Sequence, residues 1–166
     1  SDIEQLPEPE IGFAKTHEVT IKFGNPGVAF DTGSLMAELN RPLMAVTTPG
    51  QYLATGVFGT YLPANYTLWG DAEDYLLASN NNSETTREIR RIYGVRNYGD
   101  TPGIRYVPIY YNQEYDVLLG ATLQFVRTGK RSYFDEADIL AWHFMDVDVL
   151  HASNSPLNEG GQHMHF

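Results

Sequence analysis

The sequence predicts an α+β protein, in which a short β-rich N-terminal part is followed by α-helical hairpins. Apolar and polar residues alternate between Lys15 and Phe23, which is the period of a half-buried strand. Apolar residues recur at helical spacing in two segments within Tyr111–Phe166, and the short basic turn Thr128–Arg131 joins them. We therefore divide the chain into residues 1–45, the β-rich part with a linker, and residues 46–166, the helical part.

Turn signals and short apolar patterns divide the chain between the strand and the last hairpin. Ser34 is placed to cap a short helix. The segment Pro42–Pro63 contains several Gly, Pro and Thr residues and is predicted to be irregular. Two further short helices are expected at Asp71–Ala78 and Thr85–Tyr93, with a polar gap between them.

The C-terminal patterns predict an αα-hairpin. Asn112 is a good N-cap for its first helix, and Gly129 is placed to end that helix. The second helix is expected to open at Ser132 and to run to about His151. Because the connection is short, the two helices must be antiparallel.

Titratable residues concentrate in the second helix and the segment after it, which carry four of the chain's five histidines. An α-helical period places His143 and Asp146 on one stripe, at the border of an apolar face. Asp148 points to a different side and is interpreted as a solvated or structural carboxylate. Asp146 is the candidate for orienting His143. The alternative is that His143 is a structural histidine with its hydrogen bonds satisfied.

Three hypotheses fit the segment that contains His163 and His165: a terminal tail, a metal-binding pair or a substrate-binding loop. Gly160 and Gly161 precede it and allow close backbone approach, which favours the loop. A divalent metal held by the two imidazoles and a carboxylate is chemically reasonable, although the metal itself is unknown.

Composition limits the partners of the chain. The net charge of −10 argues against a nucleic-acid backbone or an anionic membrane surface as the main partner, but it does not exclude an acidic substrate. The absence of cysteine excludes disulfides and thiolate metal sites. No apolar run is long enough for a membrane span.

Six segments, taken in their order along the chain, resemble those of the exo-rhamnogalacturonan lyase and YetA-like family of polysaccharide lyases. They are AKTHEVTIKF at Ala14–Phe23, RPLMAV at Arg41–Val46, NYGD at Asn97–Asp100, NQEYD at Asn112–Asp116, RTGKRSYF at Arg127–Phe134 and HFMDVDVLH at His143–His151. The resemblance implies that residues 1–45 end a β-sandwich-like domain and that residues 46–166 begin an incomplete α/α toroid. It also implies a fragment of a longer extracellular or periplasmic enzyme.

The resemblance further implies cleavage of a uronate-containing polysaccharide, of rhamnogalacturonan or pectin type, by β-elimination. This reaction needs a base for the proton next to the uronate carboxyl, a group that neutralises the carboxylate, and an acid for the leaving oxygen. The expected catalytic residues are His143, His151, His163 and His165. The expected substrate-binding residues are Asn112 and Tyr115, followed by Tyr98 and Asp100. Arg127 and Lys130 are further candidates for offsetting substrate charge.

Two alternatives belong to other classes. The first is a non-catalytic structural or assembly protein, whose apolar helix faces need cover from another subunit or from the rest of its own chain. The second is a glycoside hydrolase, which needs two carboxylates across a cleft, for instance those of Asp146 and Glu114.

Overall fold

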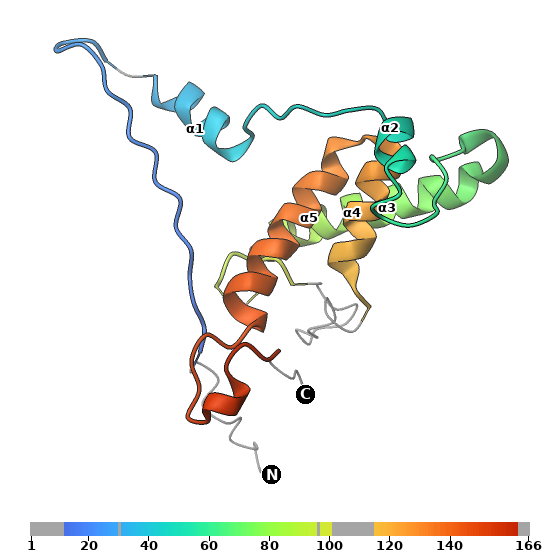
Figure 1. Ribbon diagram of the computed structural model, residues 1–166. Helices are drawn as coiled ribbons and strands as arrows, with labels where there is room; N and C mark the ends of the chain where they lie inside the picture. Colours follow the sequence, from blue (N-terminus) through green and yellow to red (C-terminus); the bar gives the residue numbers. More distant parts are fainter. Residues whose placement is uncertain (1–11, 30, 96, 101–114, 163–166) are drawn as a thin grey trace.

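The computed structural model describes residues 12–29, 31–95, 97–100 and 115–162 (Figure 1). The helices in chain order are α1 (Thr32–Asn40), α2 (Pro49–Ala54), α3 (Tyr66–Arg90), α4 (Val117–Thr128), α5 (Arg131–His143), the π-helical turn η1 (Phe144–Asp148) and the 3₁₀ turn η2 (Pro156–Asn158). Within these ranges there is no strand, and the β-type pairing is an isolated antiparallel bridge between Val149 and Gln162.

The predicted β-rich N-terminal part is therefore wrong. Residues 13–29, which we call the arm, form an extended chain up to Gly24 and then a turn at residues 25–28, as Figure 1 shows. Val19, Ile21 and Phe23 are 79%, 72% and 90% exposed. A half-buried strand needs a neighbouring strand to pair with and a surface to cover its apolar side. The described part of the chain supplies neither, so the alternation does not produce a sheet. The expected fold class, a β-rich part followed by a toroid start, is corrected to a helical one.

The arm is attached to the helical part at its first residues. The backbone N–H of Ala14 donates to the carbonyl of Asp146 over 2.8 Å. The Asp146 carboxylate accepts from the backbone N–H of Thr16 over 2.6 Å and from its hydroxyl over 2.9 Å. The backbone N–H of His151 donates to the carbonyl of Gly12 over 2.9 Å. These contacts join the arm to the segment that follows α5.

Side-chain caps fix the N-terminal ends of the two short helices α1 and α2. The carboxylate of Asp31 accepts from the backbone N–H of Ser34, so Asp31 and not Ser34 caps α1. This hydrogen bond lowers the pKa of Asp31. Thr48 and Gln51 form a capping box at α2, which lies in the segment predicted to be irregular. The Gly and Pro residues of this segment favour a loop, but the Thr-x-x-Gln pattern indicates a helix start.

Helix α3 replaces the two short helices predicted on either side of a polar gap. Asn65 caps its first turn, Trp69 departs from helical geometry with φ −132° and ψ 30°, and Arg91 ends it in the left-handed region. The polar residues of the gap continue the helix because they lie on a solvated surface. One of them, Asn80, donates from its side chain to the carbonyl of Ser132 over 3.3 Å and so contacts α5.

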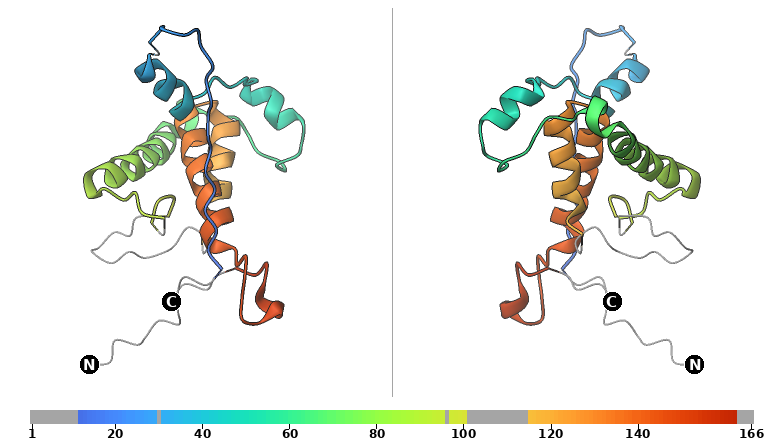
Figure 2. Two further views of the ribbon diagram at one scale, coloured as in Figure 1. Left: turned by 90° about the vertical axis from the view of Figure 1, so that its left-hand side faces the viewer. Right: turned by 90° about the vertical axis from the view of Figure 1, so that its right-hand side faces the viewer.

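The predicted antiparallel hairpin is confirmed, and it contains the buried core (Figures 1 and 2). One buried cluster joins Ala121 of α4 to Ala137 and Leu140 of α5. A second cluster joins Phe125 and Val126 of α4 to Tyr133 of α5, and the partly buried side chains around it include Tyr52 and Leu53 of α2.

The bounds of the hairpin helices differ from the prediction at three of their four ends. Gly129, with φ 69°, ends α4 as expected. Asp116 precedes α4, and the expected N-cap Asn112 lies outside the described residues. Helix α5 begins at Arg131 and not at Ser132. It also stops at His143, where η1 takes over, and does not reach His151.

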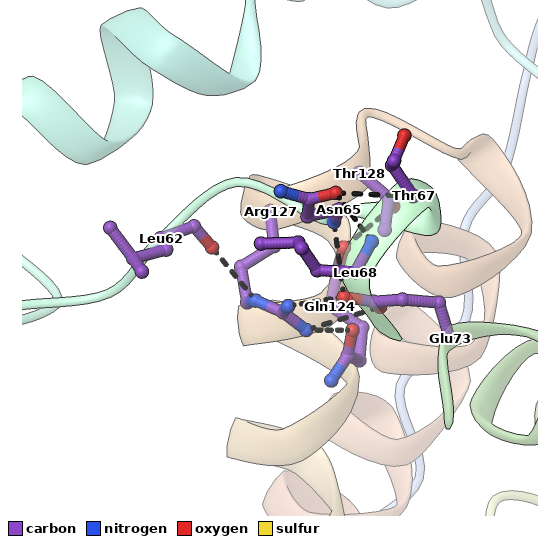
Figure 3. A network of polar contacts seen from close by, with 8 residues as sticks. All are labelled: Leu62, Asn65, Thr67, Leu68, Glu73, Gln124, Arg127 and Thr128. Atoms are coloured by element: carbon purple, nitrogen blue, oxygen red, sulfur yellow. Dashed lines mark hydrogen bonds and ion pairs between the residues drawn. The ribbon is translucent and has the colours of Figure 1, made fainter. Parts of the chain in front are cut away.

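Two buried or half-buried ion pairs fix α3 to the hairpin. Arg87 of α3 forms a two-pronged contact with the Glu136 carboxylate of α5, one prong of which measures 2.8 Å. Arg127 of α4 reaches Glu73 of α3 over 2.6 Å and also donates to the Gln124 side chain and to the carbonyl of Leu62, as Figure 3 shows. Arginine suits both positions because its planar fork donates several hydrogen bonds at once.

None of the helices in the described ranges combines the length and the apolar character that crossing a membrane requires.

Candidate functional site

The end of α5 holds a buried cluster of titratable residues. His143 is 2% exposed, and its Nδ1 lies 2.8 Å from the carbonyl oxygen of Tyr98. Because a carbonyl only accepts, Nδ1 carries a proton and donates to it. The other ring nitrogen, Nε2, lies 3.4 Å from Oδ1 of Asp148, which is ion-pair range without the geometry of a hydrogen bond. Asp148 is fully buried, at 0% exposed, and Asp100 is also buried.

The π-helical turn explains why Asp148, and not Asp146, faces His143. Residues five apart are neighbours in a π-helix, whereas residues three or four apart are neighbours in an α-helix. An α-helical period continued to His151 would place Asp148 on another side of the helix. In the structure η1 begins directly after His143, so the Asp148 carboxylate lies against the imidazole.

The loop before the undescribed segment covers the other side of His143. Gly99 has φ +90°, and a Cβ added there would lie 2.6 Å from Cβ of His143 and 2.5 Å from the carbonyl oxygen of Ile139. Only glycine permits both this backbone conformation and this close approach. The loop therefore seals the imidazole from solvent on the side of Tyr98.

Charge decides the protonation of the cluster. Burial alone would lower the pKa of His143, but the adjacent Asp148 carboxylate, the Asp100 carboxylate and the Tyr98 carbonyl together raise it above its ordinary value of 6.5. The cluster therefore favours an imidazolium beside two buried carboxyl groups. Nδ1 is hydrogen-bonded, whereas Nε2 faces Asp148 without a hydrogen bond, so the ring matches the alternative of a satisfied structural histidine at one nitrogen only. Its expected catalytic role stays a prediction.

A groove lies beside this cluster, between the arm and α5. Its volume is about 380 Å³. The arm contributes Lys15, Thr16 and Glu18, and the helical part contributes among others Tyr98, Asp138, Trp142, His143 and Asp146. Desolvation, together with the carboxylates of Glu18 and Asp135, raises the pKa of Asp138. The groove thus combines aromatic surface with three carboxylates and one ammonium group.

The predicted site residues are only partly brought together. Tyr98 and Asp100 lie next to His143. His151 is exposed and its Nε2 lies 2.6 Å from the carbonyl oxygen of Met145, so its partner differs from those of His143. Tyr115 is exposed just before α4. Three further predicted site residues, Asn112, His163 and His165, lie outside the described residues, as does Glu114.

The remaining candidates have structural contacts. The Asp146 carboxylate binds Thr16 and so holds the arm, while a role in orienting His143 stays untested. Arg127 is engaged by Glu73, and the Lys130 ammonium lies 5.1 Å from the ring centre of Tyr66. Both basic residues lie at the far end of the hairpin, and the length of α5 separates Lys130 from His143 by roughly 20 Å.

Metal binding finds no support in the part of the chain that the structure describes, because no group of three or more His, Cys, Asp or Glu residues there is arranged to hold an ion. The proposed pair His163 and His165 falls on undescribed residues. No sequence signal indicated the groove: Lys15 and Glu18 are more than 100 positions away from Trp142, so their meeting depends on the fold.

No family model, no curated protein and no solved structure matches this chain. The resemblance to the exo-rhamnogalacturonan lyase and YetA-like family is therefore contradicted. The helical architecture, in which the described residues contain no strand, also disagrees with the end of a β domain followed by a toroid.

Proposed function

We propose that this chain is a non-catalytic structural protein that works by assembling with further protein subunits. The supporting observation is the distribution of apolar side chains. The buried apolar core of the described residues consists of Ala121, Phe125, Val126, Tyr133, Ala137, Leu140 and Val147. Many more large apolar side chains are exposed, on the arm, on α3 and in the segments between the helices. Exposed apolar surface on this scale is typical of protein that packs against other protein.

The start of α3 illustrates the surface. Trp69 is 65% exposed and Leu68 is 68% exposed, although both are among the most costly side chains to leave in water. The backbone that carries them is held firmly by the Asn65 cap and by the nearby Arg127–Glu73 pair (Figure 3). A fixed backbone that presents exposed apolar side chains is suited to binding a partner with little loss of conformational entropy.

Light scattering on the isolated chain tests the proposal. We expect the mean mass to rise with protein concentration, because association buries the exposed apolar surface. In a Trp142→Phe background Trp69 is the only tryptophan, and its fluorescence should shift to shorter wavelength over the same concentration range. A monomeric mass at all concentrations, together with an unshifted Trp69 emission, would contradict the proposal.

A second candidate is cleavage of an acidic, uronate-containing polysaccharide by β-elimination in the groove between the arm and α5. It is supported by the meeting of Trp142, Tyr98 and Lys15 there, since aromatic rings bind sugar faces and an ammonium group neutralises a uronate carboxylate. The three carboxylates of the groove oppose a polyanion, which is why this candidate ranks second.

Incubation with rhamnogalacturonan and other polyuronates separates the candidates. β-Elimination forms an unsaturated product that absorbs in the ultraviolet, and Lys15→Ala and Trp142→Ala should each reduce its rate. No increase in absorbance across the substrate panel would reject the lyase. The appearance of reducing ends without unsaturation would instead indicate a glycoside hydrolase, with Asp138 and Glu18 as its carboxylate pair. In that case Asp138→Asn should abolish the activity.

A further inference from the structure

We propose that two copies of this chain pair through their arms as antiparallel strands, with Thr20 of one copy opposite Thr20 of the other. The inference rests on the proposed assembly function and names both the surface and the partner. Among the described residues the arm has no neighbouring strand, and the second copy supplies one.

The middle of the arm is free to pair. Residues 17–24 make no backbone hydrogen bond to any described residue, and their side chains are exposed. Extended backbone with free N–H and C=O groups is the form that adds to another strand. Glu18 and Lys22 also make no ion pair with the described residues.

The sequence of the arm complements itself in one register. With Thr20 opposite Thr20, Glu18 of each copy faces Lys22 of the other, which forms two ion pairs. On the opposite face Val19 of each copy lies across from Ile21 of the other, so an apolar row forms. Opposite charges and β-branched pairs directly across an antiparallel ladder are the combinations that stabilise it.

Competing registers lose these pairs. A parallel pairing in register places Glu18 next to Glu18 and Lys22 next to Lys22, so like charges repel. An antiparallel pairing slipped by two residues, with Ile21 opposite Ile21, places Glu18 opposite Gly24 and leaves both charges without a partner. Charge complementarity therefore selects the Thr20-centred antiparallel register.

The geometry of the chain makes such pairing effective. The base of the arm is held to the helical part by the hydrogen bonds between Thr16 and Asp146. Pairing of two arms therefore joins two folded units and not two free peptides. A two-stranded ribbon is marginally stable alone, so we expect the dimer to be reversible and to depend on protein concentration.

A charge-swap series tests the ion pairs in the full chain. Glu18→Lys puts like charges opposite each other twice in the symmetric dimer, and we expect dimerisation to weaken about five- to thirtyfold. Lys22→Glu should have a similar effect. The double variant Glu18→Lys/Lys22→Glu exchanges the charges and should restore the affinity of the original chain. Analytical ultracentrifugation at low salt measures the dimer dissociation constant of the original chain and of each variant. Circular dichroism checks that each variant is folded.

A cysteine series tests the register. The chain contains no cysteine, so Thr20→Cys introduces a single thiol. Two such residues opposite each other lie within disulfide range, and mild oxidation should give a covalent dimer. His17→Cys is the matched control, because this exposed residue takes no part in the ion pairs, and its two copies are about 20 Å apart in the proposed register and should not be linked.

The outcomes distinguish this inference from the function on which it rests. Equal cross-linking of both cysteine variants, or a double charge variant that does not recover affinity, overturns the arm pairing. If those results accompany a mass that still rises with concentration, assembly stands but uses another surface. If the mass stays monomeric and neither thiol is linked, both proposals fail.

Discussion

His143 is stabilised in place by charge and by hydrogen bonding at once. Its pKa is raised above 6.5, since the carboxylates of Asp148 and Asp100 outweigh the effect of burial. A group whose pKa is higher in the folded state than in the unfolded chain adds stability that is fully present below the unfolded pKa, about 6.5. That contribution is lost as the pH rises through the raised pKa of the folded state.

We therefore predict that His143→Gln is destabilised by about 3 kcal/mol or more at pH 6, because a buried carboxylate loses its cation. The original chain should lose stability as the pH rises from about 6.5 through the raised pKa of His143, and this part of the slope should be missing in the variant. Urea unfolding at several pH values measures both effects. His17→Gln, at an exposed position, is the control and should change stability by no more than about 0.5 kcal/mol. An unchanged pH slope in His143→Gln would contradict the interpretation.

Two glycines give a matched pair of alanine substitutions. We predict that Gly99→Ala destabilises the fold by about 2 kcal/mol or more, because φ is +90° and the new Cβ would clash with Ile139 and His143. Gly120→Ala, in α4 with open space around it, should instead stabilise by about 0.5–1 kcal/mol. Thermal unfolding of both variants checks the opposite signs, and a neutral Gly99→Ala would show that the loop does not seal His143.

At the scale of elements, α3 is attached to α5 through the buried pair of Arg87 and Glu136. Burial would lower the pKa of Arg87, but the hydrogen bond to Glu136 outweighs it and the pKa is raised, so the guanidinium stays charged. The cost of removing two ions from water makes such a pair a weak source of net stability. Its main effect is to fix which part of α3 meets α5.

Single and double substitutions should separate the cost of burying the two charges from the attraction between them. We predict that Arg87→Met costs about 3–5 kcal/mol, because Glu136 is left buried without a partner. The double variant Arg87→Met/Glu136→Leu should recover most of that loss, since no uncompensated charge remains. Denaturant unfolding of the original chain, Arg87→Met, Glu136→Leu and the double variant gives the coupling energy between the two side chains. A double variant that is as unstable as the single one would show that the pair contributes net stability.

Local patterns predicted some elements and missed others for identifiable reasons. The hairpin was predictable because its apolar spacing and Gly129 act within a few residues. The continuity of α3 was not, since polar residues within a helix also satisfy the signal for a loop. The groove residues Glu18 and Trp142 were not predicted as neighbours, because no local rule connects the arm with α5.

At the scale of the whole molecule, some apolar side chains of the described residues are buried around the hairpin and others are exposed to solvent. Phe125 is buried between Tyr52 and Phe134, with ring centres 5.8 Å and 5.4 Å away. Phe23 on the arm is almost fully exposed. The described core is therefore concentrated around the hairpin, and substitutions should affect stability there and association elsewhere.

We predict that Phe125→Ala destabilises the monomer by about 3–5 kcal/mol, because it leaves a cavity in the main cluster. Phe23→Ala should leave monomer stability within about 0.5 kcal/mol, because its ring contacts almost nothing. Denaturation at low protein concentration compares the two. A large loss of stability in Phe23→Ala would mean that the arm packs against the same molecule.

The sequence by itself determined the antiparallel hairpin and the end of α4 at Gly129, because these depend on periodicity and on local caps. Only the tertiary structure decided that the arm has no neighbouring strand within the described part of the chain, that a π-turn brings Asp148 to His143, and that Lys15 and Glu18 share a groove with Trp142. Those features require segments far apart in the chain, or a change of helical pitch, to place particular atoms together. The pattern of neighbouring residues does not carry that information.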